Sequence, residues 1–201
     1  MNKGSIAPLI RENYPEYYLW NEYPADECIV FTSVKSEWGI LGNFYPSSLV
    51  INGVEFVNSE QLFQMMKFSD SDTLLSIYNS RGMKIKYAAK SGENKGLRRP
   101  DWGKIIIDCM KFCLQSKYEQ CSDFRKALEA TAGFYIVEDQ SGRKTVRTVD
   151  TWGAVRVDDK FIGSNLLGRL LIELRNNGRL EYNLPDDMFE FIEQIKNSGQ
   201  L

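Results

Sequence analysis

The stretch Asn58-Ser-Glu-Gln-Leu-Phe-Gln-Met-Met-Lys-Phe68 predicts a helix that carries a carboxylate and an ammonium along one stripe of an otherwise apolar surface. At 100° per residue, three polar side chains fall within a sector of about 60°: Glu60, Gln64 and Lys67. Three apolar side chains lie roughly on the other side and are expected to face a core: Leu62, Phe63 and Met66. A polar stripe is usually the solvated side of a helix, so this pattern alone leaves a structural and a functional interpretation open.

The start of this helix carries its own signals. Asn58 is the expected N-cap, and Gln61, three residues later, is a box-like partner. Glu60 then lies in the first turn, where the helix dipole favours the carboxylate form.

Composition excludes several classes of protein. The 201 residues are 43% hydrophobic, which suits one sizeable core and about one to one and a half domains. A net charge of −2 gives no global basic field for nucleic acid, so any such contact must be local. The chain has no secretory segment and no apolar run near 18 residues, which predicts a cytoplasmic protein without a membrane partner.

Histidine is absent, which removes Ser-His-Asp and Cys-His catalysis and His-ligated metal centres. The four cysteines stand at 28, 109, 113 and 121, and their spacing favours buried thiols over a zinc site. No GxGxxG or GxxxxGK[ST] loop occurs. We therefore expect no metal and no cofactor, and proton transfer through carboxylates, lysine, tyrosine, cysteine or water.

The coarse pattern predicts a mainly helical α+β fold with a short β-hairpin or small sheet. The hairpin is Leu49–Ile51 and Val54–Val57 around an Asn52-Gly53 turn, and Cys28–Thr32 is a buried strand. Two further strand candidates, Phe134–Glu138 and Thr145–Val149, flank a Ser141-Gly142 turn. Helices are expected near 59–68, 72–79 and 83–90, then after Asp101, after Ser122, from Gly163 or Ser164 to a Gly178 C-cap, and from Pro185.

Three features besides the stripe suit a ligand site, each with a structural alternative. Asn43 and Phe44 end a loop of small and aromatic residues that suits a ligand wall or a plain turn. Trp102 opens a helix beside the basic loop 95–99, yet it also suits the core. The segment Asp150-Thr-Trp-Gly153, followed by Asn165 at a helix start, fits a pocket for a flat ring with an anionic group, although structure explains it equally well.

Glu60 and Asp150 are together candidate paired carboxylates. Two such groups flanking an anomeric carbon suffice for glycoside cleavage, and no histidine is needed. The arginines and lysines at 95–99 and 143–147 suit contact with one or two phosphates.

The same blocks resemble the NADAR family, named for its association with NAD and ADP-ribose. The resemblance spans about 31–176 and rests on separated blocks: Phe31, 42–44, Gly53, Ser59-Glu60, Phe63-Gln64, Lys67-Phe68, Trp102, Trp152-Gly153 and 163–175. It implies a single compact, mostly helical domain with N-glycosidase activity. The family is linked to removal of ADP-ribose from guanine in nucleic acid and, in some members, to hydrolysis of ribosylamine intermediates of riboflavin synthesis.

Position by position, the resemblance implies catalytic roles for Glu60 and Lys67, with Asp150 as the second acid. It also places three residues around the ligand: Trp102, Trp152 and Asn165. To these we add further expected substrate-binding residues: Asn43, Phe44, Gly153 and Arg98. Three positions depart from the pattern: Gln61 replaces a histidine, Gly92-Glu93 replaces Gly-Arg, and the acid before Trp152 stands one residue closer. The second departure leaves phosphate recognition to Arg98 or Arg99.

The leading hypothesis is hydrolysis of a ribose C1–N bond, with ADP-ribosylated guanine in nucleic acid as substrate. Its rivals are a glycosidase for ribosylaminopyrimidine phosphates and a non-catalytic module that binds NAD or ADP-ribose. The resemblance also implies a toxin partner with ADP-ribosyltransferase activity. We expect an aromatic N-terminal extension at 1–28 packed on the body, the catalytic domain at 29–178, and a C-terminal helical extension at 179–201.

Overall fold

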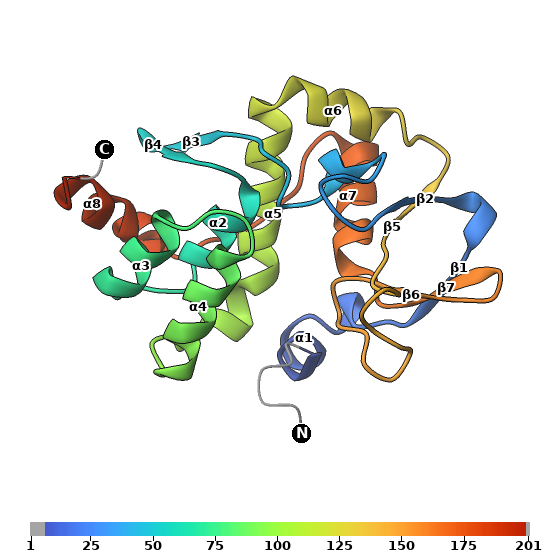
Figure 1. Ribbon diagram of the computed structural model, residues 1–201, viewed down its shortest axis with the longest axis horizontal. Coiled ribbons are helices and arrows are strands. Elements are labelled where there is room, and N and C mark those ends of the chain that lie inside the picture. The colour runs from blue at the N-terminus through green and yellow to red at the C-terminus, as the bar shows by residue number, and fades with distance from the viewer. Residues whose placement is uncertain (1–6, 200–201) are drawn as a thin grey trace. The chain divides into compact units, whose positions relative to one another are not determined.

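The structure is a computed structural model that describes residues 7–199. Helices predominate and the strands are short, so the predicted mainly helical α+β class is confirmed (Figure 1). The chain contacts define two units, described separately below: residues up to Gly42 with Ser122–Leu180, and Asn43–Cys121 with the residues from Glu181 onward. The domain boundaries expected at 28 and 178 stay predictions.

The second unit opens with the predicted hairpin. Strands β3 (Leu49–Ile51) and β4 (Val54–Phe56) pair antiparallel. The turn residues Asn52 and Gly53 both have positive φ, 49° and 83°. A type I′ turn needs this conformation at both central positions, and Asn-Gly adopts it at low cost.

Helix α2 (Ser59–Met65) follows the hairpin and is buried along its whole length. The Asn58 side chain accepts a hydrogen bond from the backbone N–H of Gln61 at 2.9 Å, as the sequence predicted. Gln61 reaches back to the backbone N–H of Val57 at 3.0 Å. Because even the polar stripe is buried, the interpretation of that stripe as a solvated face is wrong.

Three helices of this unit pack around α2, as Figure 1 shows: α3 (Ser71–Tyr78), α4 (Lys84–Asn94) and α5 (Trp102–Gln120). A short 3-10 turn, η4 (Asp186–Phe189), leads into α8 (Glu190–Asn197), which packs on α3 and β4. Asp101 precedes α5 but makes no capping bond, because its carboxylate is paired with Arg99 instead. The helix expected after Asp101 is confirmed, and it begins without a side-chain cap.

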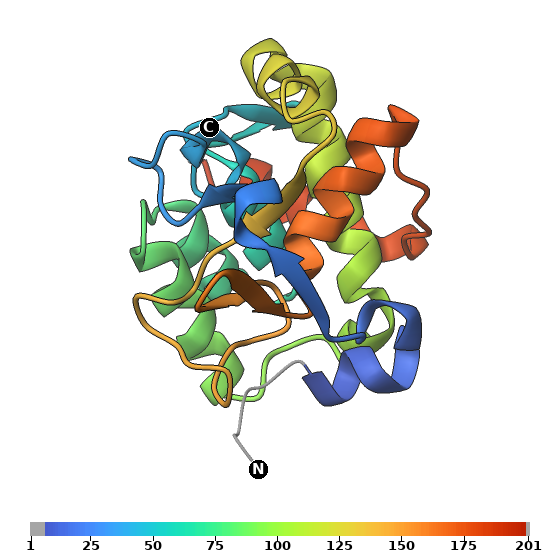
Figure 2. The same cartoon turned by 90° about the vertical axis from the view of Figure 1, so that its right-hand side faces the viewer.

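The first unit holds two small sheets (Figures 1 and 2). Strands β1 (Asn21–Pro24), β7 (Lys160–Gly163) and β6 (Val155–Val157) form an antiparallel sheet in that order. Strands β2 (Cys28–Phe31) and β5 (Tyr135–Glu138) pair in parallel. The segment Thr145–Val149 is a turn closed by Thr148 and Val149 N–H groups on the Thr145 carbonyl, so its assignment as a strand is wrong.

The helices of this unit are α1 (Ala7–Asn13), α6 (Ser122–Glu129) and α7 (Leu166–Asn177), with short 3-10 turns η1 (Pro15–Tyr17), η2 (Ala25–Glu27) and η3 (Gly39–Leu41). Helix α7 lies along β5 in both views. Its apolar face buries five leucines: Leu166, Leu167, Leu170, Leu171 and Leu174. The helix ends at Gly178 as predicted, but it begins three residues after Gly163, which belongs to β7.

Candidate active site

Glu60 is a buried carboxylate in the first turn of α2. Its backbone N–H donates to the Asn43 carbonyl at 3.0 Å, which joins the helix start to the preceding loop. Its Oε1 accepts a hydrogen bond from Gln64 Nε2 at 2.7 Å and lies 3.6 Å from Lys86 Nζ. The side chain is only 6% exposed, whereas that of Lys86 is 45% exposed. Within the described chain both polar contacts use Oε1, so Oε2 is the oxygen available to a reacting group.

Lys67 follows the last turn of α2 and is also largely buried. Its Nζ lies 3.3 Å from Glu93 Oε1 on α4 and 5.5 Å from the ring centroids of Phe63 and Trp102. Burial lowers the pKa of the Lys67 ammonium below its ordinary value, although the Glu93 and Glu60 carboxylates oppose this change. Burial raises the pKa of Glu93, but the Lys67 and Lys90 ammoniums outweigh it and leave a lowered pKa.

Three of the predicted ligand residues surround these charges. Trp102 is 1% exposed and packs against Phe63 with ring centroids 5.3 Å apart, so the two rings together contact the Lys67 ammonium. The half-buried ring of Phe44 carries the Lys86 ammonium at 4.9 Å from its centroid. Buried Asn43 accepts from Ser59 Oγ at 3.2 Å and donates to Met110 Sδ, so its side chain anchors the loop.

The two arginines of the basic loop before α5 have different surroundings. Arg98 is exposed and forms a β-bridge with Phe68 through its backbone. Arg99 is engaged by two carboxylates, Asp101 and Asp187, each at 2.9 Å. Of the two arginines expected to bind phosphate, only Arg98 therefore has its side chain outside an ion-paired cluster.

In the first unit, Asp150 organises the segment around Trp152. Its Oδ1 accepts from Gln140 Nε2 at 2.7 Å and from the backbone N–H of Trp152 at 2.9 Å. The Asp150 N–H donates in turn to Gln140 Oε1 at 3.3 Å, which closes the loop 140–150 at its base. Trp152 is half-buried. Asp150 and Glu60 belong to different units, and their convergence on one sugar stays a prediction.

Asn165 and Gly153 have structural tasks in the same unit. The Asn165 Nδ2 donates to the Ile136 carbonyl at 2.7 Å, and its Oδ1 accepts from the Glu138 N–H at 3.1 Å. These bonds fasten the start of α7 to β5. A Cβ on Gly153 would lie 2.5 Å from the Glu138 carbonyl oxygen, so only glycine fits there. The roles of both residues toward a ligand stay predictions.

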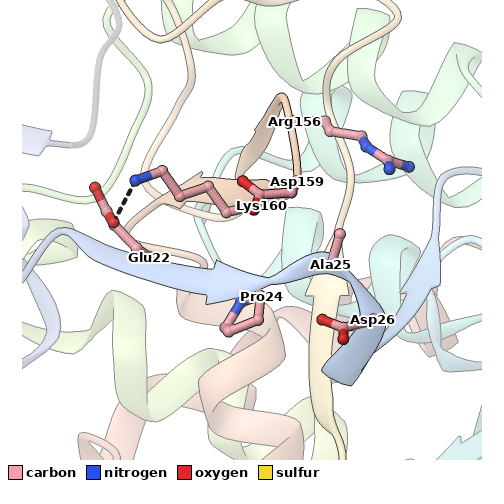
Figure 3. A pocket seen from close by; sticks show the side chains of 7 residues that line it. All are labelled: Glu22, Pro24, Ala25, Asp26, Arg156, Asp159 and Lys160. Atoms are coloured by element: carbon pink, nitrogen blue, oxygen red, sulfur yellow. Dashed lines mark hydrogen bonds and ion pairs between the residues drawn. The ribbon is translucent and has the colours of Figure 1, made fainter.

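A separate cavity of about 630 Å³ lies beside β1 and the β6–β7 turn, and none of the predicted site residues lines it (Figure 3). One ion pair lies in it, between Lys160 Nζ and Glu22 at 2.6 Å, and Arg156 Nε donates to the backbone carbonyl of Asp158. This cavity and the predicted site residues therefore lie in different places. We favour the buried charges around Glu60 as the site, because they combine a carboxylate, an amine and aromatic rings.

Two members of this charge cluster, Lys86 and Glu93, were not predicted from the sequence. A signal for them existed, because Lys86, Lys90 and Glu93 recur at helical spacing along α4. The predicted helix ended at 90, which left Glu93 outside it.

The charge cluster by itself indicates a class of protein. A buried carboxylate in the first turn of α2 and a largely buried amine just after its last turn lie against aromatic rings and without histidine, which suits acid–base or electrostatic chemistry on a small organic group. Within residues 7–199, no group of three or more carboxylates and cysteines is arranged to hold a metal ion. None of the described helices has the length and apolar character needed to cross a bilayer.

The NADAR domain matches residues 30–179, and the chain belongs to this family. The N-glycosidase YbiA of Shigella flexneri serotype 5b is 29% identical over 157 residues, which cover 78% of this chain and 91% of that protein. A riboflavin biosynthesis protein of Vibrio vulnificus is 26% identical over 171 residues, 85% of this chain but only 43% of that longer protein.

A solved structure agrees with the fold. The NMR structure of the Escherichia coli protein YbiA aligns with a TM-score of 0.60 and 29% identity, over 76% of this chain and 84% of that one. These findings support a hydrolase that acts on N-glycosidic bonds.

Proposed function

We propose that this protein hydrolyses an N-glycosidic bond between a ribose C1 and a nitrogen, with Glu60 as the catalytic carboxylate. The observation that carries the proposal is the Glu60 side chain, which is buried, held at Oε1 and close to a second buried titratable group, Lys67. Residues arranged in this way are enriched at catalytic sites.

In the proposed reaction the C1–N bond breaks as positive charge develops on the ribose. The Glu60 carboxylate stabilises this charge and accepts a proton from the water that adds to C1. The Lys67 ammonium transfers a proton to the departing nitrogen, which leaves as a neutral amine, and the proton that Glu60 took from water returns through solvent to Lys67. Asp150 is proposed to support the leaving base or the ribose hydroxyls.

The preferred substrate in this proposal is ADP-ribose attached to guanine in nucleic acid. Ring stacking is proposed at Phe44, and phosphate contact at exposed Arg98. A toxin with ADP-ribosyltransferase activity would be the partner that makes this substrate.

A second substrate has its own support. One relative is named a riboflavin biosynthesis protein, and the net charge of −2 suits a small anionic ligand held locally better than a long duplex. A ribosylaminopyrimidine phosphate presents the same ribose C1–N bond and is therefore the alternative substrate.

One assay separates these cases. Protein is incubated with an ADP-ribosylated guanine oligonucleotide and, in parallel, with a ribosylaminopyrimidine phosphate, and free ADP-ribose or free pyrimidine amine is measured. Release from the oligonucleotide supports the preferred substrate, and release from the small substrate alone supports the second. Binding of ADP-ribose with no turnover of either compound would refute the hydrolase and leave a binding module.

A further inference from the structure

Glu93 forms ion pairs with one buried lysine, Lys67, and one exposed lysine, Lys90. It lies in the last turn of α4, and its two carboxylate oxygens take different partners: Oε1 is 3.3 Å from Lys67 Nζ, and Oε2 is 3.3 Å from Lys90 Nζ. The Glu93 side chain is 21% exposed, that of Lys67 12% and that of Lys90 52%. One arm of Glu93 therefore reaches the buried ammonium, and the other is tied to a cation at the surface.

The surroundings of Lys67 explain why such a partner is needed. Phe63 of α2 and Trp102 of α5 face the ammonium with their rings, and aromatic surroundings by themselves disfavour a charge that has lost its water. The charged groups near it are Glu60 of α2 and Glu93 and Lys86 of α4. The carboxylates favour the ammonium form, and Lys86 disfavours it.

Of the two carboxylates, only Glu93 contacts Lys67 directly, since Glu60 is bound to Gln64 and Lys86. We propose that Glu93 is a positioning residue that holds Lys67 against the two rings and keeps it protonated, so that Lys67 acts on the substrate as a cation and not as a nucleophilic amine. This inference rests on the proposed function, and it chooses between hydrolysis and an imine route, because only a neutral lysine can attack a sugar carbon.

The test compares Glu93→Gln with wild type, because the amide keeps the shape of the carboxylate and removes its charge. The pKa of Lys67 is measured by ¹³C reductive methylation and NMR, with its signal assigned by its absence from Lys67→Arg. We expect the pKa to fall by about one pH unit or more when the opposite charge is removed. Lys90→Ala is the matched control, because it cuts only the exposed arm of Glu93.

Activity gives a second readout on the same variants. If Lys67 works as a cation, the alkaline limb of the kcat/KM profile moves to lower pH in Glu93→Gln by about the same amount, and Glu93→Asp restores part of it. Faster turnover by Glu93→Gln at neutral pH would overturn the proposal, because it would mean that the neutral amine is the reactive form. An unchanged Lys67 pKa would overturn it as well.

These outcomes are separable from a failure of the proposed function. The NMR measurement needs no substrate, so it judges the Glu93 contact even if no glycoside is cleaved. Conversely, loss of activity in a Glu60 variant together with an unmoved Glu93→Gln profile would retain the hydrolase and reject the role of Glu93.

Discussion

Replacing Gly168 with alanine is expected to destabilise the first unit, because this glycine lies where helix α7 packs on strand β5. Gly168 lies in the first turn of α7, pressed against β5. A Cβ built there would lie 1.9 Å from the Ile136 carbonyl oxygen and 2.5 Å from Asn165 Nδ2, whereas real Cβ atoms keep 3.0 Å or more. In Gly168→Ala, helix and strand must therefore separate by about 1 Å.

That separation breaks the contacts of Asn165 with β5. Its bonds to Ile136 and Glu138, at 2.7 and 3.1 Å, each contribute about 1 kcal/mol. Overpacking adds roughly 1–3 kcal/mol, and the higher helix propensity of alanine returns about 1 kcal/mol. We expect a net loss of about 2–4 kcal/mol, which lowers the melting temperature by roughly 5–15 °C for a chain of this size.

Thermal unfolding followed by circular dichroism measures this loss. Gly142→Ala is the matched control, because a Cβ at Gly142 meets nothing within 4 Å and its backbone does not need glycine. A Gly168→Ala protein that melts within about 2 °C of Gly142→Ala would refute the packing described for α7 and β5.

Two further predictions concern lysines. Burial lowers the pKa of Lys117 to about 7, so above pH 7 the unfolded chain binds a proton that the folded chain lacks, and the free energy of unfolding rises with pH by up to about 1.4 kcal/mol per pH unit. Urea unfolding at pH 7.0 and 8.5 should show a smaller rise in Lys117→Met than in wild type, and equal rises would contradict the assignment. Borohydride added during turnover should trap no covalent adduct at Lys67, and an adduct that disappears in Lys67→Ala would establish the imine route instead.

Local signals predicted the parts of the fold that depend on neighbouring residues. The Asn52-Gly53 turn and the Asn58 cap are set by backbone preferences within a few residues, so the sequence contains enough information to place them. Strands β6 and β7 were missed, since each is short and β7 pairs with β1, about 140 residues away along the chain. Such pairing leaves little trace in local composition.

The errors have physical causes of the same kind. Thr145–Val149 has the β-branched residues of a strand, but the Gln140–Asp150 hydrogen bonds close it into a loop. Asn165 is a different case: a polar side chain at a helix start suggested a ligand contact, the structure shows both ends of its amide bonded to the backbone of β5, and the ligand contact stays a prediction. The sequence could place Glu60 and Lys67 near each other because both fall on one predicted helix, while Glu93, which pairs with Lys67, comes from another helix.

The central claim is that the Glu60 carboxylate performs the chemistry, and Glu60→Gln tests it most directly. The variant keeps the shape of the side chain, and Glu55→Gln on the exposed face of β4 is the matched control. Release of the ribose-bound nitrogen is measured under single-turnover conditions with both proteins folded. We expect Glu60→Gln to be slower by at least about 10²-fold and the control to match wild type. A Glu60→Gln protein that cleaves at close to the wild-type rate would contradict the account.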